Sequence, residues 1–222
     1  MKDSFLADTA LIHWGNWTAR VRPGWGVGRL LLLLHGWTGD ENSMWLFARR
    51  LPADFTLLAP RAPHPEARRG YSWRPVAPQT WGLPALEDFR PAAQDLLTFI
   101  DGWSRQAGVE ASVFDVMGFS QGAALGYALA LLYPPRVGRL AALAGFLPEG
   151  AAALLAARPL TGKAVYVVHG RRDEMIPVER ARQAVGWLEQ AGAQVTYCEA
   201  DTGHKVSPDC LRGLDEFFLE RS

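Results

Sequence analysis

Cysteine is scarce in this sequence of 222 residues, which contains only Cys198 and Cys210. The two do not form a Cys-x-x-Cys motif, and they are too few for a disulfide framework or a cysteine-rich zinc site. We therefore expect two half-buried thiols in a protein of a reducing compartment.

Net charge and long runs of like charge are also absent. The 23 basic side chains balance the 23 acidic ones, and like charges follow one another in pairs at most. Such a chain lacks the electrostatic footprint of proteins that bind nucleic acid or anionic membranes. We expect neither as a partner.

A long uninterrupted apolar segment is missing as well. Charged residues between Met1 and Asp8 leave no room for the hydrophobic region of a signal peptide, so we expect a cytoplasmic location. The 20 uncharged residues between Asp115 and Arg136 match a membrane span in length. Polar residues and glycines interrupt them and Pro134-Pro135 end them, which favours a strand, a turn and a buried helix over a membrane span.

The sequence does contain short apolar runs that alternate with stretches of helical period, and Leu30 to Leu34 is the clearest buried strand. This alternation predicts one doubly wound, mostly parallel α/β domain over residues 1–222, with antiparallel strands before Leu30 at one edge. Further strands are expected at residues 56–59, 113–117, 140–144, 164–168 and 194–198, and helices at 44–51, 86–103, 122–133, 178–190 and 208–219. Residues 61–84 hold five prolines and break the pattern, which is typical of a long functional loop.

The segment Gly118-Phe119-Ser120-Gln121-Gly122 follows a predicted strand and opens a predicted helix. That is the G-x-S-x-G nucleophile elbow in the context it requires, and its glycines let strand and helix approach closely. Ser120 is the predicted nucleophile, and a serine hydroxyl needs a base. Only His169 and His204 follow it. The acid before His169 could only be Glu149, at a presumed helix start, so His204 is the better base.

Two acids lie between Ser120 and His204 at suitable places. Asp173 follows a predicted strand at the carboxyl edge of the sheet, where the sites of α/β sheets gather. Asp201 is only three residues from His204 and fits a turn better. The predicted triad is Ser120, Asp173 and His204; the alternative is a salt-bridged loop aspartate and an exposed loop histidine.

Acyl transfer also needs donors for a developing oxyanion. The backbone N–H of Gln121, directly after the nucleophile, is one candidate, and that of Trp37, in the loop after the first buried strand, is the other. The alternative for this loop is a tight turn with Asp40 as a helix cap. We predict that His35 is structural.

The sequence resembles, over nearly its whole length, the phospholipase/carboxylesterase family of α/β hydrolases, which includes the acyl-protein thioesterases. The resemblance rests on Leu34-His35-Gly36, Ser72-Trp73, Gly118-Phe119-Ser120-Gln121-Gly122, Gly145-Phe146-Leu147-Pro148, His169-Gly170-Arg171-Arg172-Asp173, Ile176-Pro177-Val178 and Gly203-His204. It implies a broad esterase or thioesterase with the same triad and oxyanion donors. Thr38 and Ala144 depart from the family's frequent Gly and Ser, and Thr38 puts the shape of the oxyanion loop in doubt.

Aromatic side chains gather in the loops expected around this site. Trp73, Trp81 and Phe146 are the predicted substrate-binding residues; the alternative is that such rings fill the core. Three arginines of the long loop are candidates for binding an anionic group, although a solvated loop surface is the commoner explanation: Arg68, Arg69 and Arg74.

The predicted function is a serine hydrolase that cleaves small to medium carboxylic esters or thioesters through an acyl-enzyme. Only 17 residues, 146 to 162, are available for a cap, so none is expected. The histidines show no i, i+4 pair, so we expect no metal and no cofactor. A serine peptidase and a non-catalytic binding module are the alternatives. The oligomeric state stays open, with a homodimer as one candidate.

Overall fold

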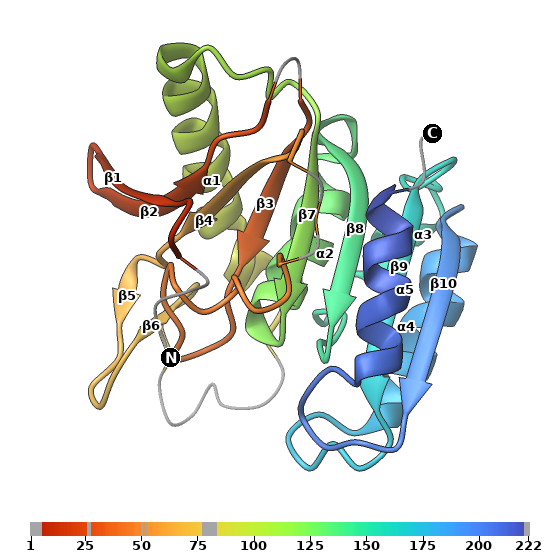
Figure 1. Ribbon diagram of the computed structural model, residues 1–222. Helices are drawn as coiled ribbons and strands as arrows, with labels where there is room; N and C mark the ends of the chain where they lie inside the picture. The colour runs from red at the N-terminus through yellow and green to blue at the C-terminus, as the bar shows by residue number, and fades with distance from the viewer. Residues whose placement is uncertain (1–5, 26–27, 50, 52, 77–83, 220–222) are drawn as a thin grey trace.

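The computed structural model describes residues 6–25, 28–49, 51, 53–76 and 84–219. Its main sheet has eight strands (Figure 1). In spatial order they are β1 (Ala10–Trp14), β2 (Trp17–Arg22), β4 (Thr56–Pro60), β3 (Leu30–Leu34), β7 (Phe114–Phe119), β8 (Val137–Leu143), β9 (Ala164–Gly170) and β10 (Gln194–Ala200). The strands from β4 to β10 are parallel, and β1 and β2 are antiparallel at one edge, which confirms the expected arrangement.

The central strand β3 consists of five buried leucines whose side chains alternate between two cores. Leu30, Leu32 and Leu34 face one core, whereas Leu31 and Leu33 face the other. This period of two follows from strand geometry, and burial on both faces explains why the run is apolar throughout. The sheet is therefore covered on both sides.

Helices α1 (Leu86–Ala107), α2 (Gln121–Leu132) and α4 (Val178–Gln190) cover one face, and α5 (Pro208–Leu219) covers the other (Figure 1). The 3₁₀ turn η2 (Pro134–Arg136) precedes β8. Between β8 and β9 the short helix α3 (Ala152–Leu155) is the one helix of the described chain. The connection is too short for a cap domain. Together these elements form the α/β-hydrolase fold.

The helix expected at residues 44–51 is wrong, because the described residues 41–49 form a series of turns. Backbone amides there bond three residues back, as from Phe47 to Met44 and from Ala48 to Trp45. These bonds close separate turns and do not build the ladder of bonds four residues back that defines an α-helix. The Trp45 indole N–H also donates to the Glu41 carbonyl at 2.8 Å.

The long loop contains a small hairpin, β5 (His64–Pro65) paired with β6 (Tyr71–Ser72). The hairpin lies beside the lower edge of the main sheet in Figure 1, the edge to which the arrowheads of the parallel strands point. Structured chain therefore stands next to the carboxyl ends of the strands.

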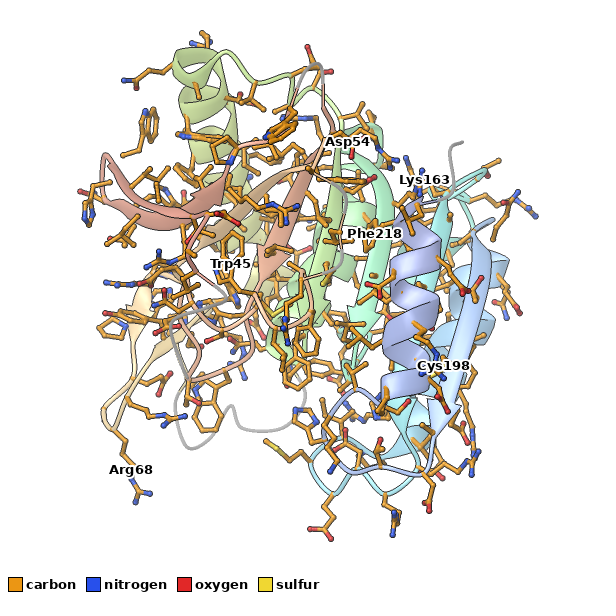
Figure 2. The ribbon with its side chains drawn as sticks, in the orientation of Figure 1. Trp45, Asp54, Arg68, Lys163, Cys198 and Phe218 are labelled. Atoms are coloured by element: carbon orange, nitrogen blue, oxygen red, sulfur yellow. A yellow bond between two sulfur atoms is a disulfide. The ribbon has the colours of Figure 1, made fainter. Side chains whose placement is uncertain are left out.

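The two cysteines form a disulfide, so the expectation of free thiols is wrong. Cys198, labelled in Figure 2, lies on β10. Cys210 lies on the first turn of α5, and the two Cα atoms are 5.7 Å apart. The chain returns from the strand end to the helix and brings together two residues that sequence spacing alone does not connect. The expected cytoplasmic location loses the support of free thiols, because disulfides persist mainly in oxidising compartments. None of the helices in the described ranges is both long and apolar enough to cross a membrane.

Candidate active site

Ser120 lies between β7 and α2 in a sharp turn with φ 54° and ψ −115°. Such backbone is strained for a non-glycine residue and is held by its surroundings. A Cβ at Gly118 would approach the carbonyl oxygen of Gly122 to 2.3 Å, and one at Gly122 would approach that of Leu34 to 2.2 Å. The two glycines are therefore needed for strand and helix to pack this closely.

A continuous chain of hydrogen bonds joins the three predicted triad residues. The Ser120 hydroxyl oxygen lies 3.0 Å from His204 Nε2, and His204 Nδ1 lies 2.7 Å from Asp173 Oδ2. Ser120 comes after β7, Asp173 after β9 and His204 after β10, so the common edge of the parallel strands brings them together. The arrangement can activate a hydroxyl as a nucleophile.

The Asp173 carboxylate is buried and fixed at both oxygens. Oδ1 accepts the backbone N–H groups of Met175 and Ile176 at 2.9 Å each, while Oδ2 contacts His204. His169 is also buried; its Nε2 donates to the Ile176 carbonyl at 2.8 Å and lies 3.4 Å from Asp173 Oδ2. His169 thus contacts the acid and the Ile176 carbonyl, and no hydrogen bond to Ser120 is among its described contacts.

Asp201, the alternative acid, lies elsewhere. Its carboxylate pairs with Arg172 at 2.9 Å, and both side chains are exposed. Asp201 and Arg172 therefore form a surface ion pair.

The loop after β3, which carries Trp37, is tied to the β5–β6 hairpin. Thr38 N–H donates to the Tyr71 carbonyl at 3.0 Å, and Tyr71 N–H donates to the Gly39 carbonyl at 2.9 Å. Thr38 has φ 65°, a conformation that favours glycine and costs another residue about 1–2 kcal/mol. Thr38 thus takes the backbone shape that glycine would take at this position.

At the base of that loop, two hydrogen bonds hold the His35 ring in one tautomer. Its Nδ1 donates to the Gly36 carbonyl at 2.8 Å, and its Nε2 accepts the Ala62 N–H at 3.0 Å. The second bond requires a neutral imidazole, because both ring nitrogens of a protonated histidine are donors. Burial lowers the pKa of His35, against a smaller opposing effect of the hydrogen bond to Gly36 and of Asp40 and Glu41.

We expect this histidine to make the protein less stable at mildly acidic pH. The unfolded chain takes up a proton near the ordinary histidine pKa of about 6.5, whereas folded His35, whose pKa is lowered, takes it up only at lower pH. The free energy of unfolding should therefore fall as pH is lowered through 6.5 and below. Denaturant titrations at pH 7.5 and 5.5 measure this fall, which should be smaller in His35→Gln. Equal falls in the two proteins would contradict it.

The side chain of Gln121 connects the turn at Ser120 to Ser72 and Trp73 of the long loop. Its Oε1 accepts the Trp73 N–H at 2.9 Å, and its Nε2 donates to the Ser72 hydroxyl at 2.9 Å. Its backbone N–H stands at the first residue of α2, the positive end of that helix. Gln121 therefore joins the turn at Ser120, the long loop and the start of α2.

Trp73 does not have the place expected of a substrate-binding residue. Its side chain is only 1% exposed, its indole N–H donates to the His35 carbonyl at 2.8 Å, and its ring packs 5.0 Å from the His35 ring. Trp73 is a core residue that supports the loop after β3. Trp81 lies outside the described residues.

A cavity of about 120 Å³ opens beside Ser120. Its described lining residues are Trp37, Arg74, Val76, Pro84, Ser120, Gln121, Phe146, Met175 and Ile176. Phe146 is one of the predicted substrate-binding residues and Trp37 is a predicted oxyanion donor, whereas the sequence analysis does not predict Met175 or Ile176 at the site. A larger hollow of about 1020 Å³ lies beside Arg29 and Asp115, but no triad residue is among its described lining.

Metal ligands do not cluster in the part of the chain that the structure describes, where no group of three His, Cys, Asp or Glu side chains could hold an ion.

Comparison with known proteins gives a consistent family. The phospholipase/carboxylesterase family model matches residues 21–220. The esterase YpfH of Escherichia coli is 31% identical over 193 residues, which cover 80% of this chain and 76% of that protein. A probable inactive carboxylesterase of Oryza sativa subsp. japonica is 31% identical over 122 residues, and that match spans only 49% of the rice protein. A crystal structure of a carboxylesterase from Mesorhizobium loti superposes with a TM-score of 0.78 at 22% identity, covering 96% of this chain and 100% of that one.

Proposed function

The chain belongs to the phospholipase/carboxylesterase family of α/β hydrolases, and from that membership we propose that it is a serine carboxylesterase that works through an acyl-enzyme. The family supports a hydrolase of the esterase class acting on a small-molecule ester. The observation that carries the finer proposal is the hydrogen-bonded chain of Ser120, His204 and Asp173.

In the proposed reaction Ser120 Oγ attacks the ester carbonyl carbon while His204 Nε2 accepts its proton. The backbone N–H groups of Gln121 and Trp37 stabilise the oxyanion that develops. His204 then gives the proton to the leaving alcohol or thiol, and a water molecule hydrolyses the acyl-enzyme with His204 again as the base. Asp173 keeps His204 in the tautomer with Nδ1–H and stabilises the imidazolium.

Two alternatives compete with this proposal. A peptidase of the same fold usually carries extra cap elements, and the short helix α3 provides little of that kind. A non-catalytic binding module is raised by the rice relative, whose name calls it inactive. Such modules generally lose a triad member, whereas all three residues are present here at hydrogen-bond distance. We also propose that residues 1–222 form a single domain.

The size of the cavity leads to a prediction for the acyl group. The cavity of about 120 Å³ beside Ser120 is small, which favours acyl chains of short to medium length. We expect p-nitrophenyl esters from acetate to octanoate to be hydrolysed in free solution, with activity at least tenfold lower for palmitate. Beyond the apolar wall, each further methylene loses its contribution of about 0.8 kcal/mol.

The measurement is the rate of p-nitrophenol release across the series, below and above the solubility limit of each ester. Because no element of the described residues forms a cap over the serine, no jump in activity is expected at that limit. A sharp rise there, or a preference for palmitate, would contradict the prediction. S-acyl thioesters of the same acids, measured in parallel, compare the two leaving groups.

A further inference from the structure

A buried ion pair joins the turns after β3 to the residue that follows β4. The side chain of Glu41 is only 4% exposed, and both of its oxygens accept N–H groups of Arg61: Oε2 from Nε at 2.7 Å and Oε1 from Nη2 at 2.9 Å. Burial alone would raise the pKa of Glu41, but its hydrogen bonds, foremost those from Arg61, outweigh that effect and leave the pKa below its ordinary value. The carboxylate is therefore charged at neutral pH and needs its guanidinium partner.

The geometry of this pair suits it to hold two segments of chain in one arrangement. Two parallel bonds between a guanidinium and a carboxylate fix the orientation of the groups as well as their distance. Stability alone does not explain the pair, because apolar side chains of similar volume in place of a buried ion pair are often as stabilising or more so. A role in setting the conformation of the surrounding chain is the other explanation.

Tyr71 on β6 connects the pair back to the loop after β3. Its hydroxyl accepts an N–H of Arg61 Nη1 at 3.2 Å, and Arg61 Cζ lies 4.7 Å from the centre of its ring. The Tyr71 backbone N–H donates to the Gly39 carbonyl at 2.9 Å, and Gly39 is two residues before Glu41. The contacts therefore form a closed ring that starts and ends at Gly39. Three side chains of this ring are called the ion-pair unit below: Glu41, Arg61 and Tyr71.

The proposed oxyanion donor, the backbone N–H of Trp37, lies in the loop that this ring holds. The residues on both sides of Trp37 are fixed by backbone bonds: the Gly36 carbonyl accepts the Gly39 N–H at 3.0 Å, and the Thr38 N–H donates to the Tyr71 carbonyl at 3.0 Å. No side chain of the ion-pair unit is among the described lining residues of the cavity beside the nucleophile. We therefore expect the unit to act through the loop and not on the substrate itself.

We propose that the ion-pair unit positions the oxyanion donor: it holds the Trp37 N–H in place for the developing negative charge without contacting the substrate. This inference rests on the proposed esterase function. A donor stabilises the transition state only at a set position, and a displacement of about 1 Å lowers a rate by about 100-fold. Loss of the unit should therefore lower kcat and leave the binding of a neutral ligand nearly unchanged.

The test removes both charges of the pair together, so that no charged group is buried alone. In the double variant Glu41→Met with Arg61→Met, kcat for p-nitrophenyl butyrate should fall by about 10- to 100-fold. Glu41→Gln keeps the shape but loses one charge-assisted bond, and its kcat should fall by about 3- to 10-fold. Arg136→Met is the matched control, because Arg136 also bonds both oxygens of a carboxylate, that of Asp101, but directly before β8, at the opposite ends of the parallel strands from Ser120. Its kcat should stay within about twofold of the wild type.

Two ketones distinguish loss of positioning from general damage to the site. With 1,1,1-trifluoro-2-pentanone, Ser120 Oγ forms a bond to the carbonyl carbon, the hydroxyl proton passes to His204, and the carbonyl oxygen becomes an oxyanion, as in the proposed transition state. Its analogue 2-pentanone serves as the ligand that binds without that step. In the double variant the inhibition constant of the trifluoro ketone should rise by the factor by which kcat/KM falls, whereas that of 2-pentanone should stay within about twofold.

Three results would overturn the inference. A fall in kcat of less than about tenfold in the folded double variant, or an equal rise of both inhibition constants, would refute the positioning role and leave the esterase proposal standing. If the wild type hydrolyses no p-nitrophenyl ester, the proposed function fails and the inference fails with it. Circular dichroism shows whether each variant is folded. If the double variant is not, the same measurements on Glu41→Gln decide, and a fall of less than about threefold there refutes the role.

Discussion

Ser120→Ala should lower kcat for p-nitrophenyl butyrate by at least 10⁴-fold, the largest effect that we expect of any single substitution. The reason is that the proposed acyl-enzyme would form on the Ser120 hydroxyl, which lies 3.0 Å from Nε2 of the proposed base His204. The remaining rate would come from the oxyanion donors and substrate binding alone. Initial rates at saturating ester, measured on protein of unchanged circular dichroism, give the value.

Covalent labelling provides an independent measurement of the same prediction. A fluorophosphonate should add one label to the wild type, at Ser120, and none to Ser120→Ala. Ser43→Ala, which removes an exposed hydroxyl in the turns after β3, is the control and should keep both the label and the activity. Activity of Ser120→Ala within tenfold of the wild type would show that the mechanism is wrong.

Asp173→Asn should lower kcat by about 10⁴-fold with little change in fold. An amide of the same shape still accepts the Met175 and Ile176 amides at its oxygen, so the loop has no reason to move. Facing His204, however, it presents an NH₂ group to Nδ1. This favours the tautomer with the proton on Nε2, and Nε2 then cannot accept the proton of Ser120.

Asp201→Asn is the matched control, since it makes the same chemical change three residues from His204. It breaks only an exposed ion pair with Arg172, whose contribution to stability is within about 1 kcal/mol. We expect its kcat to stay within a few-fold of the wild type. The reverse ranking of the two variants would assign the acid to Asp201.

The hydrophobic periodicity of the sequence predicts the bounds of a helix well where a proline marks its start. Helices α4 and α5 begin and end at the residues expected from the sequence, and each starts at or directly after a proline. Helix α1 continues beyond Trp103 to Ala107, because Arg105 and Gln106 in its last turn are polar and exposed and so add nothing to the apolar pattern. Gly108, with φ 68°, is the signal in the sequence that marks its true end.

The candidate triad is predictable because strand order fixes where loops meet. Parallel strands end at one edge, so an acid after β9 and a histidine after β10 must both lie near a serine after β7. Contacts that depend on side-chain direction are not predictable in this way. Nothing in the order of residues places Trp73 in the core or Arg74 in the cavity, and no spacing rule pairs Cys198 with Cys210.

The disulfide restrains the segment that contains His204. Cys198 and Cys210 close a ring of chain, and His204 stands halfway around it. Closing a ring of this length reduces the freedom of the unfolded chain by an amount worth about 3 kcal/mol of stability. Ser120 and Asp173, by contrast, sit on open turns held only by noncovalent contacts. His204 therefore lies in a segment that the disulfide joins to both β10 and α5. On partial unfolding of the sheet, we expect Ser120 and Asp173 to separate from His204 before this segment itself opens.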